Sequence, residues 1–116
     1  MRVQRIVANM ETRDPAAAKA FYQGILGLHV LMDHGWIATF GNDGEQRPQV
    51  SFASEGGSGT PVPELSIEVD DLDEALSRML AAGHEIIYGP ATEPWGVRRF
   101  FVNDPFGRLV NILVHL

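Results

Sequence analysis

Few residues of this sequence have the types and spacing that catalysis or metal binding requires. The chain has no cysteine, which excludes disulfides, thiolate nucleophiles and cysteine-ligated zinc, so a metal would need His, Asp, Glu or amide oxygen ligands. The histidines show no helical i, i+4 pairing, and no Ser-His-Asp order or nucleophile elbow is visible. We interpret each of them as a surface or loop residue: His29, His34, His84 and His115.

The remaining polar candidates lie on predicted strands, where side chains alternate between two faces. Leu65 and Ile67 suit burial under a helix, which turns Ser66 to the other face. The same alternation predicts a semi-polar face with these members: Asn9, Glu11, Gln49, Ser51, Glu64, Ser66, Glu68 and Asn111. For Glu11 and Glu68 the plainer alternative is that they face water on a half-exposed sheet.

The elements that must position these residues follow the order βαβββ in the first half of the chain. A strand over 5–12 is followed by Asp14-Pro15, a favoured N-cap and first helical residue. Further strands are predicted over 28–32, 36–40 and 49–53. Apolar residues at three- and four-residue spacing predict a helix that ends at Gly27: Ala18, Phe21, Tyr22, Ile25 and Leu26.

The second half of the chain repeats this order. A capped helix starts at Asp71, with Glu74 three residues on, and ends at Gly83. The predicted helix starts and ends of the two halves are spaced almost equally, which indicates a duplicated module. The segment 54–63, rich in glycine and proline, is interpreted as a flexible connector. The predicted strands of this half cover 65–69, 86–88, 97–102 and 109–114.

Composition and charge exclude several classes of protein. The 116 residues are 45% hydrophobic and 21% charged, which suits one domain. The net charge is −6 and the basic residues are scattered, so a nucleic-acid partner is not expected. No apolar run approaches the ~18 residues of a membrane span, and neither a signal peptide nor an anchor is visible. We predict a cytoplasmic protein with no membrane partner.

Three stretches together resemble one known family. Residues 12–28 contain Asp14-Pro15, Phe21-Tyr22 and Leu26-Gly27-Leu28, similar to a "V-x-D … FY … LGL" opening. Residues 67–75 repeat the strand-to-helix part, and 99–110 look like an "FxDPxGNxIE" ending. The chain is therefore identified as resembling the vicinal oxygen chelate superfamily of glyoxalases, bleomycin resistance proteins and extradiol dioxygenases.

The resemblance implies an α+β fold of two tandem βαβββ modules, about 1–53 and 64–116, joined by a linker over 54–63. It implies curved mixed sheets, helices on their convex faces and a concave ligand cavity. It also implies a homodimer, in which strands are sometimes exchanged.

Enzymes of this family hold a divalent metal through four strand positions. In this sequence they fall on Val7, on Ser51 (or Gln49 if the register slips), on Glu64 and on Asn111. Only Glu64 is a strong ligand, so functional chelation is disfavoured and no cofactor is expected, with a divalent metal as the remaining alternative.

Without a metal, the resemblance leaves a pocket with aromatic and polar groups. Trp95, in a loop beside Pro94 and Gly96, is the aromatic most expected to contact a ligand. Arg98 and Arg99 lie on opposite strand faces, so one of them points toward the cavity, unless it forms a surface salt bridge. Other aromatics lie on or beside the predicted strands: Trp36, Phe40, Phe100, Phe101 and Phe106. Alternation requires Phe100 or Phe101 to be core, and core packing is also the alternative for Trp36. The predicted ligand-binding set is Asn9, Trp36, Ser51, Glu64, Trp95, Arg98 and Asn111.

We therefore predict a metal-independent small-molecule binding protein, similar to bleomycin-resistance-type sequestering proteins. The alternative is a metal-dependent lyase, isomerase or dioxygenase with an atypical ligand set, in which Glu64 is the candidate catalytic residue. A third hypothesis is a structural dimer whose cavity is filled by its own side chains.

Overall fold

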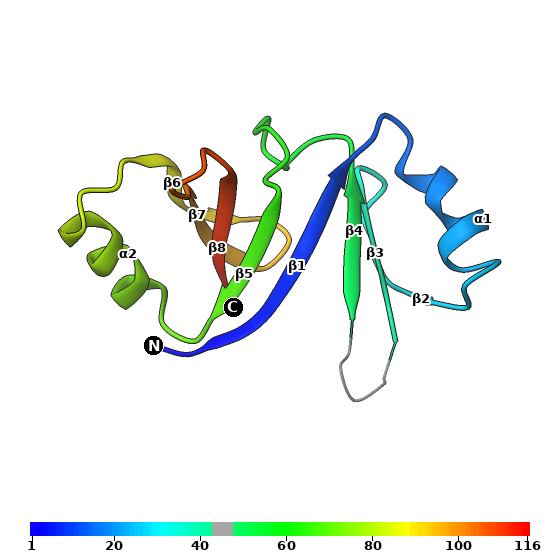
Figure 1. Cartoon of the computed structure of the whole chain (residues 1–116), viewed down its shortest axis with the longest axis horizontal. Coiled ribbons are helices and arrows are strands. Elements are labelled where there is room, and N and C mark those ends of the chain that lie inside the picture. The colour runs from blue at the N-terminus through cyan, green and yellow to red at the C-terminus, as the bar shows by residue number, and fades with distance from the viewer. Residues whose placement is uncertain (43–47) are drawn as a thin grey trace. The chain divides into compact units, whose positions relative to one another are not determined.

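The computed structural model describes residues 1–42 and 48–116 and contains two βαβββ modules (Figure 1). The chain forms two compact units. One contains residues 7–62, and the other contains residues 1–6 together with 63–116. The first half contains β1 (Val3–Glu11), the 3-10 turn η1 (Pro15–Ala17), α1 (Ala18–Tyr22), β2 (His29–Asp33), β3 (Ile37–Gly41) and β4 (Gln49–Ala53). The second half contains β5 (Leu65–Val69), α2 (Leu72–Ala81), β6 (Ile86–Glu93), β7 (Val97–Asn103) and β8 (Leu109–His115).

The strands form a mixed sheet with the order β2-β3-β4-β1-β5-β8-β7-β6. Both modules use the same pairing scheme. The first strand of each module runs parallel to its last one, β1 with β4 and β5 with β8. The pairs β2–β3, β3–β4, β6–β7 and β7–β8 are antiparallel. The predicted α+β class and the repeated module are confirmed. Among the described residues, no helix has the length and apolar character to cross a membrane.

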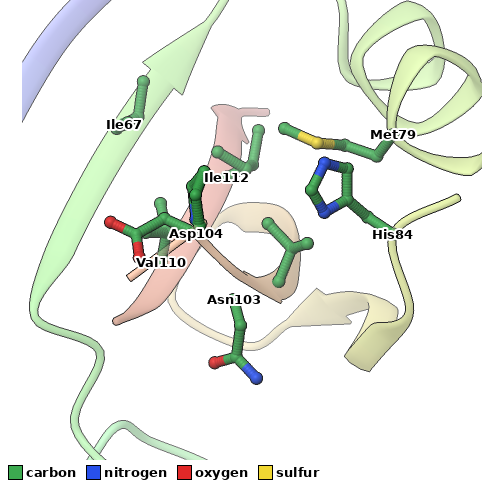
Figure 2. Close-up of a pocket in the computed structure, with 9 residues that line it drawn as sticks. Ile67, Met79, His84, Asn103, Asp104, Val110 and Ile112 are labelled. Atoms are coloured by element: carbon green, nitrogen blue, oxygen red, sulfur yellow. The ribbon is translucent and has the colours of Figure 1, made fainter. Parts of the chain in front are cut away.

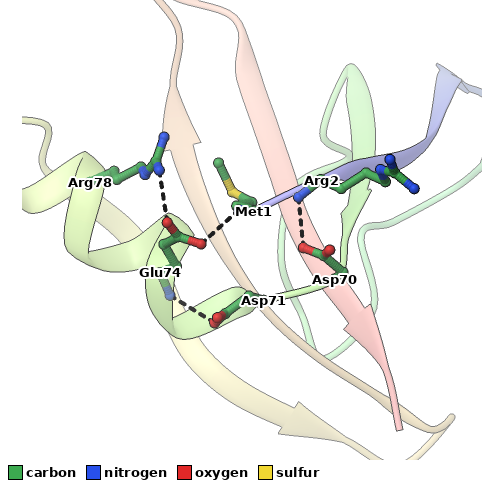
Figure 3. Close-up of polar contacts among 6 residues, drawn as sticks. All are labelled: Met1, Arg2, Asp70, Asp71, Glu74 and Arg78. Carbon is green, nitrogen blue, oxygen red and sulfur yellow. Dashed lines mark hydrogen bonds and ion pairs between the residues drawn. The ribbon is translucent and has the colours of Figure 1, made fainter.

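Helix α2 starts and ends where the sequence predicts. Asp71 Oδ1 accepts a hydrogen bond from the Glu74 backbone N–H at 3.0 Å, which caps the helix (Figure 3). Glu74 also binds the amino group of Met1 at 2.8 Å and Arg78 at 2.7 Å. The core of this module joins helix and sheet through Leu72, Ala75, Val69, Phe100, Val102, Val110 and Ile112. Leu80, near the C-terminal end of the helix, is 56% exposed.

Helix α1 is shorter than predicted. It has five residues after the turn η1, and the chain then continues in turns to Leu28 instead of a helix to Gly27. The N–H groups of Gln23 and Gly24 share the carbonyl of Lys19, so the regular ladder ends there, and glycine is a poor helix former. Ile25 and Leu26, which the predicted helix included, lie beyond the end of α1 and are exposed. Asp14 also makes no side-chain cap.

The connector 54–63 contains a hydrogen-bonded turn. The Gly56 N–H donates to the Thr60 carbonyl at 2.8 Å, and the Thr60 hydroxyl donates to the Gly57 carbonyl at 2.7 Å. Gly56 and Thr60 are buried. A Cβ on Gly56 would collide with the carbonyl oxygen of Pro61, so the turn needs a glycine there.

Strands β4 and β5 match their predicted bounds, and most others differ by one or two residues. The exception is β6, which we expected to end at Tyr88. It continues to Glu93 because irregular pairing between Tyr88 and Ala91 accommodates Gly89 and Pro90. The longer strand places Glu93 near Arg99 of β7.

Candidate ligand-binding site

The face of the second module opposite α2 carries three of the polar residues that alternation predicted: Ser66, Glu68 and Asn111. Val110 and Ile112 of β8 pack in the core that includes α2, so Asn111 between them points to the opposite face. Its partner across the parallel pair is Ser66 of β5, and its partner across the antiparallel pair is Phe101 of β7. We call the surface formed by Ser66, Glu68, Arg99, Phe101, Asn111 and His115 the helix-free face of module 2.

Asn111 has an unsatisfied hydrogen-bond acceptor. Asn111 is only 6% exposed, and its Nδ2 donates a hydrogen bond to Ser66 Oγ at 3.1 Å. The amide oxygen Oδ1 is buried with no hydrogen-bond partner. A buried polar atom left unpaired costs about 1–3 kcal/mol. The arrangement therefore favours a molecule that brings an O–H or N–H donor to this oxygen.

The first module has a corresponding polar row. Ser51 of β4 lies opposite Asn9 of β1 on one side and Thr39 of β3 on the other. In the second module Asn111 of β8 has the equivalent neighbours, Ser66 of β5 and Phe101 of β7. Asn9, Thr39 and Ser51 are buried, and the hydroxyls of Thr39 and Ser51 are 2.7 Å apart. This row confirms the alternation predicted for Asn9 and Ser51.

A second polar group on the helix-free face is centred on Glu68. Its carboxylate lies 3.1 Å from Arg5 Nε and 2.8 Å from His115 Nδ1. We did not expect His115 here, because the last strand was predicted to end at Val114. That strand includes His115, and the period-two alternation from Asn111 would have placed the imidazole on this face.

Arg99, and not Arg98, is the arginine on this face. Its guanidinium is buried, lies 3.1 Å from Glu93 Oε2, and stacks 5.0 Å from the centre of the Trp95 ring. Tyr88 donates to the other oxygen of Glu93 at 2.8 Å. Arg98 projects to the opposite side, where it pairs with Asp73 of α2 at 2.9 Å. The placement of Arg98 with the ligand-binding set is therefore corrected, because strand alternation turns it toward the helix.

Glu64 and Trp36 also lie apart from the polar rows. The Glu64 side chain is 54% exposed and pairs with Arg108 at 2.7 Å, and the hydrogen bond that Arg108 donates to it raises the pKa of Arg108. Trp36 precedes β3 and stacks beside His34. The structure thus joins Asn111 to Ser66, Asn9 to Ser51 and Trp95 to Arg99, but it does not gather the whole predicted set.

The four positions inherited from the family do not fit a divalent metal. Val7 is an apolar residue with 3% exposure, and Ser51 bonds to Thr39. Glu64 is engaged by Arg108, and Asn111 offers only an amide oxygen. Within 1–42 and 48–116 no group of three or more His, Asp or Glu residues has the geometry to hold an ion. We therefore derive no chemical step through a metal.

Solved structures with the same fold support a common architecture. The chain has a TM-score of 0.72 and 17% identity to a variant of Streptomyces coelicolor methylmalonyl-CoA epimerase in complex with 2-nitronate-propionyl-CoA, over 98% of this chain and 99% of that one. A superfamily member from Vibrio splendidus 12B01 gives 0.64 and 18%, over 97% and 99%. A protein described as an NAD-dependent benzaldehyde dehydrogenase from Legionella pneumophila gives 0.76 and 18%, over 97% and 100%. At these identities the likeness shows the fold alone.

The family model agrees with this fold. No curated protein matches the chain. The model described as "Glyoxalase/Bleomycin resistance protein/Dioxygenase superfamily" matches residues 5–112, nearly the whole chain. With its two βαβββ modules, the chain belongs to the glyoxalase/bleomycin resistance protein/dioxygenase superfamily.

Proposed function

We propose that this protein binds a small organic molecule on the helix-free face of module 2, without a catalytic metal. The observation that carries the proposal is the buried Oδ1 of Asn111, which has no hydrogen-bond partner. Buried polar groups in folded proteins are nearly always satisfied. A ligand that donates a hydrogen bond to Oδ1 would satisfy this one.

The chemistry of the face limits the ligand. One N–H of Asn111 Nδ2 donates to Ser66, and Oδ1 is the side-chain atom with no partner, so the favoured ligand brings a hydroxyl, amide or ammonium donor to that oxygen. An anionic group at the same point would face the negative end of the amide dipole. Nearby, the carboxylate of Glu68 is held by Arg5 and His115. The favoured ligand is therefore a neutral or cationic hydrogen-bond donor.

The side chains at the family's metal-ligand positions favour ligand binding over metal-dependent catalysis. The enzymatic alternative assigns the role of base or principal ligand to Glu64, but that carboxylate is exposed and bound to Arg108. The epimerase of the same fold was solved with a nitronate-bearing coenzyme A derivative, which supports the capacity of this fold to hold an organic ligand. The homodimer, the concave cavity and the cytoplasmic location stay predictions.

A thermal-shift screen with neutral and cationic donors of hydrogen bonds, in buffer with EDTA, tests the proposal. Compounds that stabilise the wild type should lose their effect in Asn111→Leu, which removes the amide. They should keep it in Gln23→Leu, which removes an exposed amide from the first module. Equal stabilisation of wild type and Asn111→Leu would overturn the proposal.

A further inference from the structure

A pocket on the other side of the same sheet has no role in the proposed function. It lies between α2 and the sheet, has a volume of about 190 Å³, and its walls are almost entirely apolar (Figure 2). The pocket is lined by Ile67, Met79, His84, Val102, Val110 and Ile112, together with Asn103, Asp104 and Pro105. The pocket is partly open to solvent, so a small molecule can reach it from outside.

Local structure fixes the wall on the helix side. Gly83 has a φ of +85°, and the N–H of His84 donates to the Met79 carbonyl at 3.0 Å, which is the hydrogen bond of a Schellman motif. This motif brings His84 back over the last turn of α2, where Figure 2 shows its imidazole beside the Met79 side chain and across from Ile112. The half-buried imidazole is a hydrogen-bonding group on the wall of the pocket, whose lining also includes Asn103 and Asp104.

We propose that this pocket binds a small aromatic molecule of the size of a phenol. An apolar cavity of about 150 Å³ holds a benzene ring, so this pocket has room for one ring with a substituent. The largely apolar walls and the carboxylate of Asp104 disfavour an anionic ligand, because its desolvation would be uncompensated. The Met79 sulfur makes favourable contacts with ring edges, and the imidazole of His84 can exchange a hydrogen bond with a hydroxyl substituent.

Titration with benzene and with phenol, followed by NMR of the methyl groups of Met79 and Ile112, tests this proposal. Both compounds should shift these methyl signals in a saturable way. The substitution His84→Ala should weaken phenol about fivefold, the effect of one lost hydrogen bond, and should change benzene less than about twofold. Ile67→Phe, which places a ring in the pocket, should weaken both compounds by more than about tenfold.

The control is Ile87→Phe, the same change at a residue of β6 that is 44% exposed and does not line the pocket. It should bind both compounds like the wild type. The absence of saturable shifts in the wild type, or equal weakening of both compounds by His84→Ala, would overturn the proposal, and neither result depends on the folding of Ile67→Phe. Benzene carries no donor for Asn111, so failure here is separate from failure of the proposed function.

Discussion

Asn111 and Ser66 face each other across the parallel pair of β5 and β8, and their 3.1 Å hydrogen bond uses the amide nitrogen of Asn111 while its oxygen stays unpaired. In the first module, the equivalent strand position holds Ser51, whose hydroxyl is bonded to Thr39. The two polar rows thus share a register but differ in hydrogen bonding. Among the described residues, only the row of the second module presents a buried acceptor without a partner.

Replacement of Asn111 by leucine should separate stability from binding. Leucine has the same branching and removes the unpaired oxygen, so the free energy of unfolding should stay within about 1 kcal/mol of the wild type or rise. Urea unfolding measures it. A loss of several kcal/mol would mean that the amide is needed for the fold rather than for a ligand.

Thr39 and Ser51 should be energetically coupled. Ser51→Ala leaves the buried Thr39 hydroxyl without its partner, which should cost about 1–3 kcal/mol. Adding Thr39→Val removes that hydroxyl, and the double variant should be more stable than the sum of the single changes predicts. Additive effects in the double-mutant cycle would contradict the coupling.

The buried pair of Arg99 and Glu93 should respond to substitution far more than the exposed pair of Arg98 and Asp73. Glu93→Leu leaves a buried guanidinium without its carboxylate and should cost about 3–5 kcal/mol. Asp73→Leu breaks a pair in which the aspartate is 84% exposed and should cost less than about 1 kcal/mol. Chemical unfolding of both variants compares them, and similar losses would show that burial does not control the effect.

The two predicted N-caps should differ in strength. Asp71→Ala removes a side-chain hydrogen bond to the Glu74 N–H and should cost about 1 kcal/mol. Asp14→Ala removes no such bond and should cost much less. If both variants lose equal stability in urea unfolding, the cap geometry at Asp71 does not explain its contribution.

Local rules predicted the elements but not their long-range contacts. Alternation placed Ser66 and Asn111 on one face, and the Asp71 and Gly83 signals bounded α2, because each depends on neighbouring residues only. The end of α1 was missed because the glycine at position 24 interrupts a helical pattern that apolar spacing alone would continue.

The ion pairs that decide which charged side chains reach the site join distant parts of the chain. Contacts of Glu68 with His115, of Glu64 with Arg108 and of Arg98 with Asp73 depend on which strands are adjacent and on their register. The sequence of a single strand contains no such information. The volume beneath α2 depends likewise on how side chains from several elements fill space, which periodicity does not determine.

The most direct measurement of the proposed function is calorimetric titration of the best ligand from the donor screen into wild type and Asn111→Leu, each in EDTA. We predict saturable binding to the wild type without metal and a loss of affinity of about fivefold or more in the variant, the effect of at least one buried hydrogen bond. Binding that EDTA abolishes and added metal restores, or equal affinity in both proteins, would contradict a metal-independent site at Asn111.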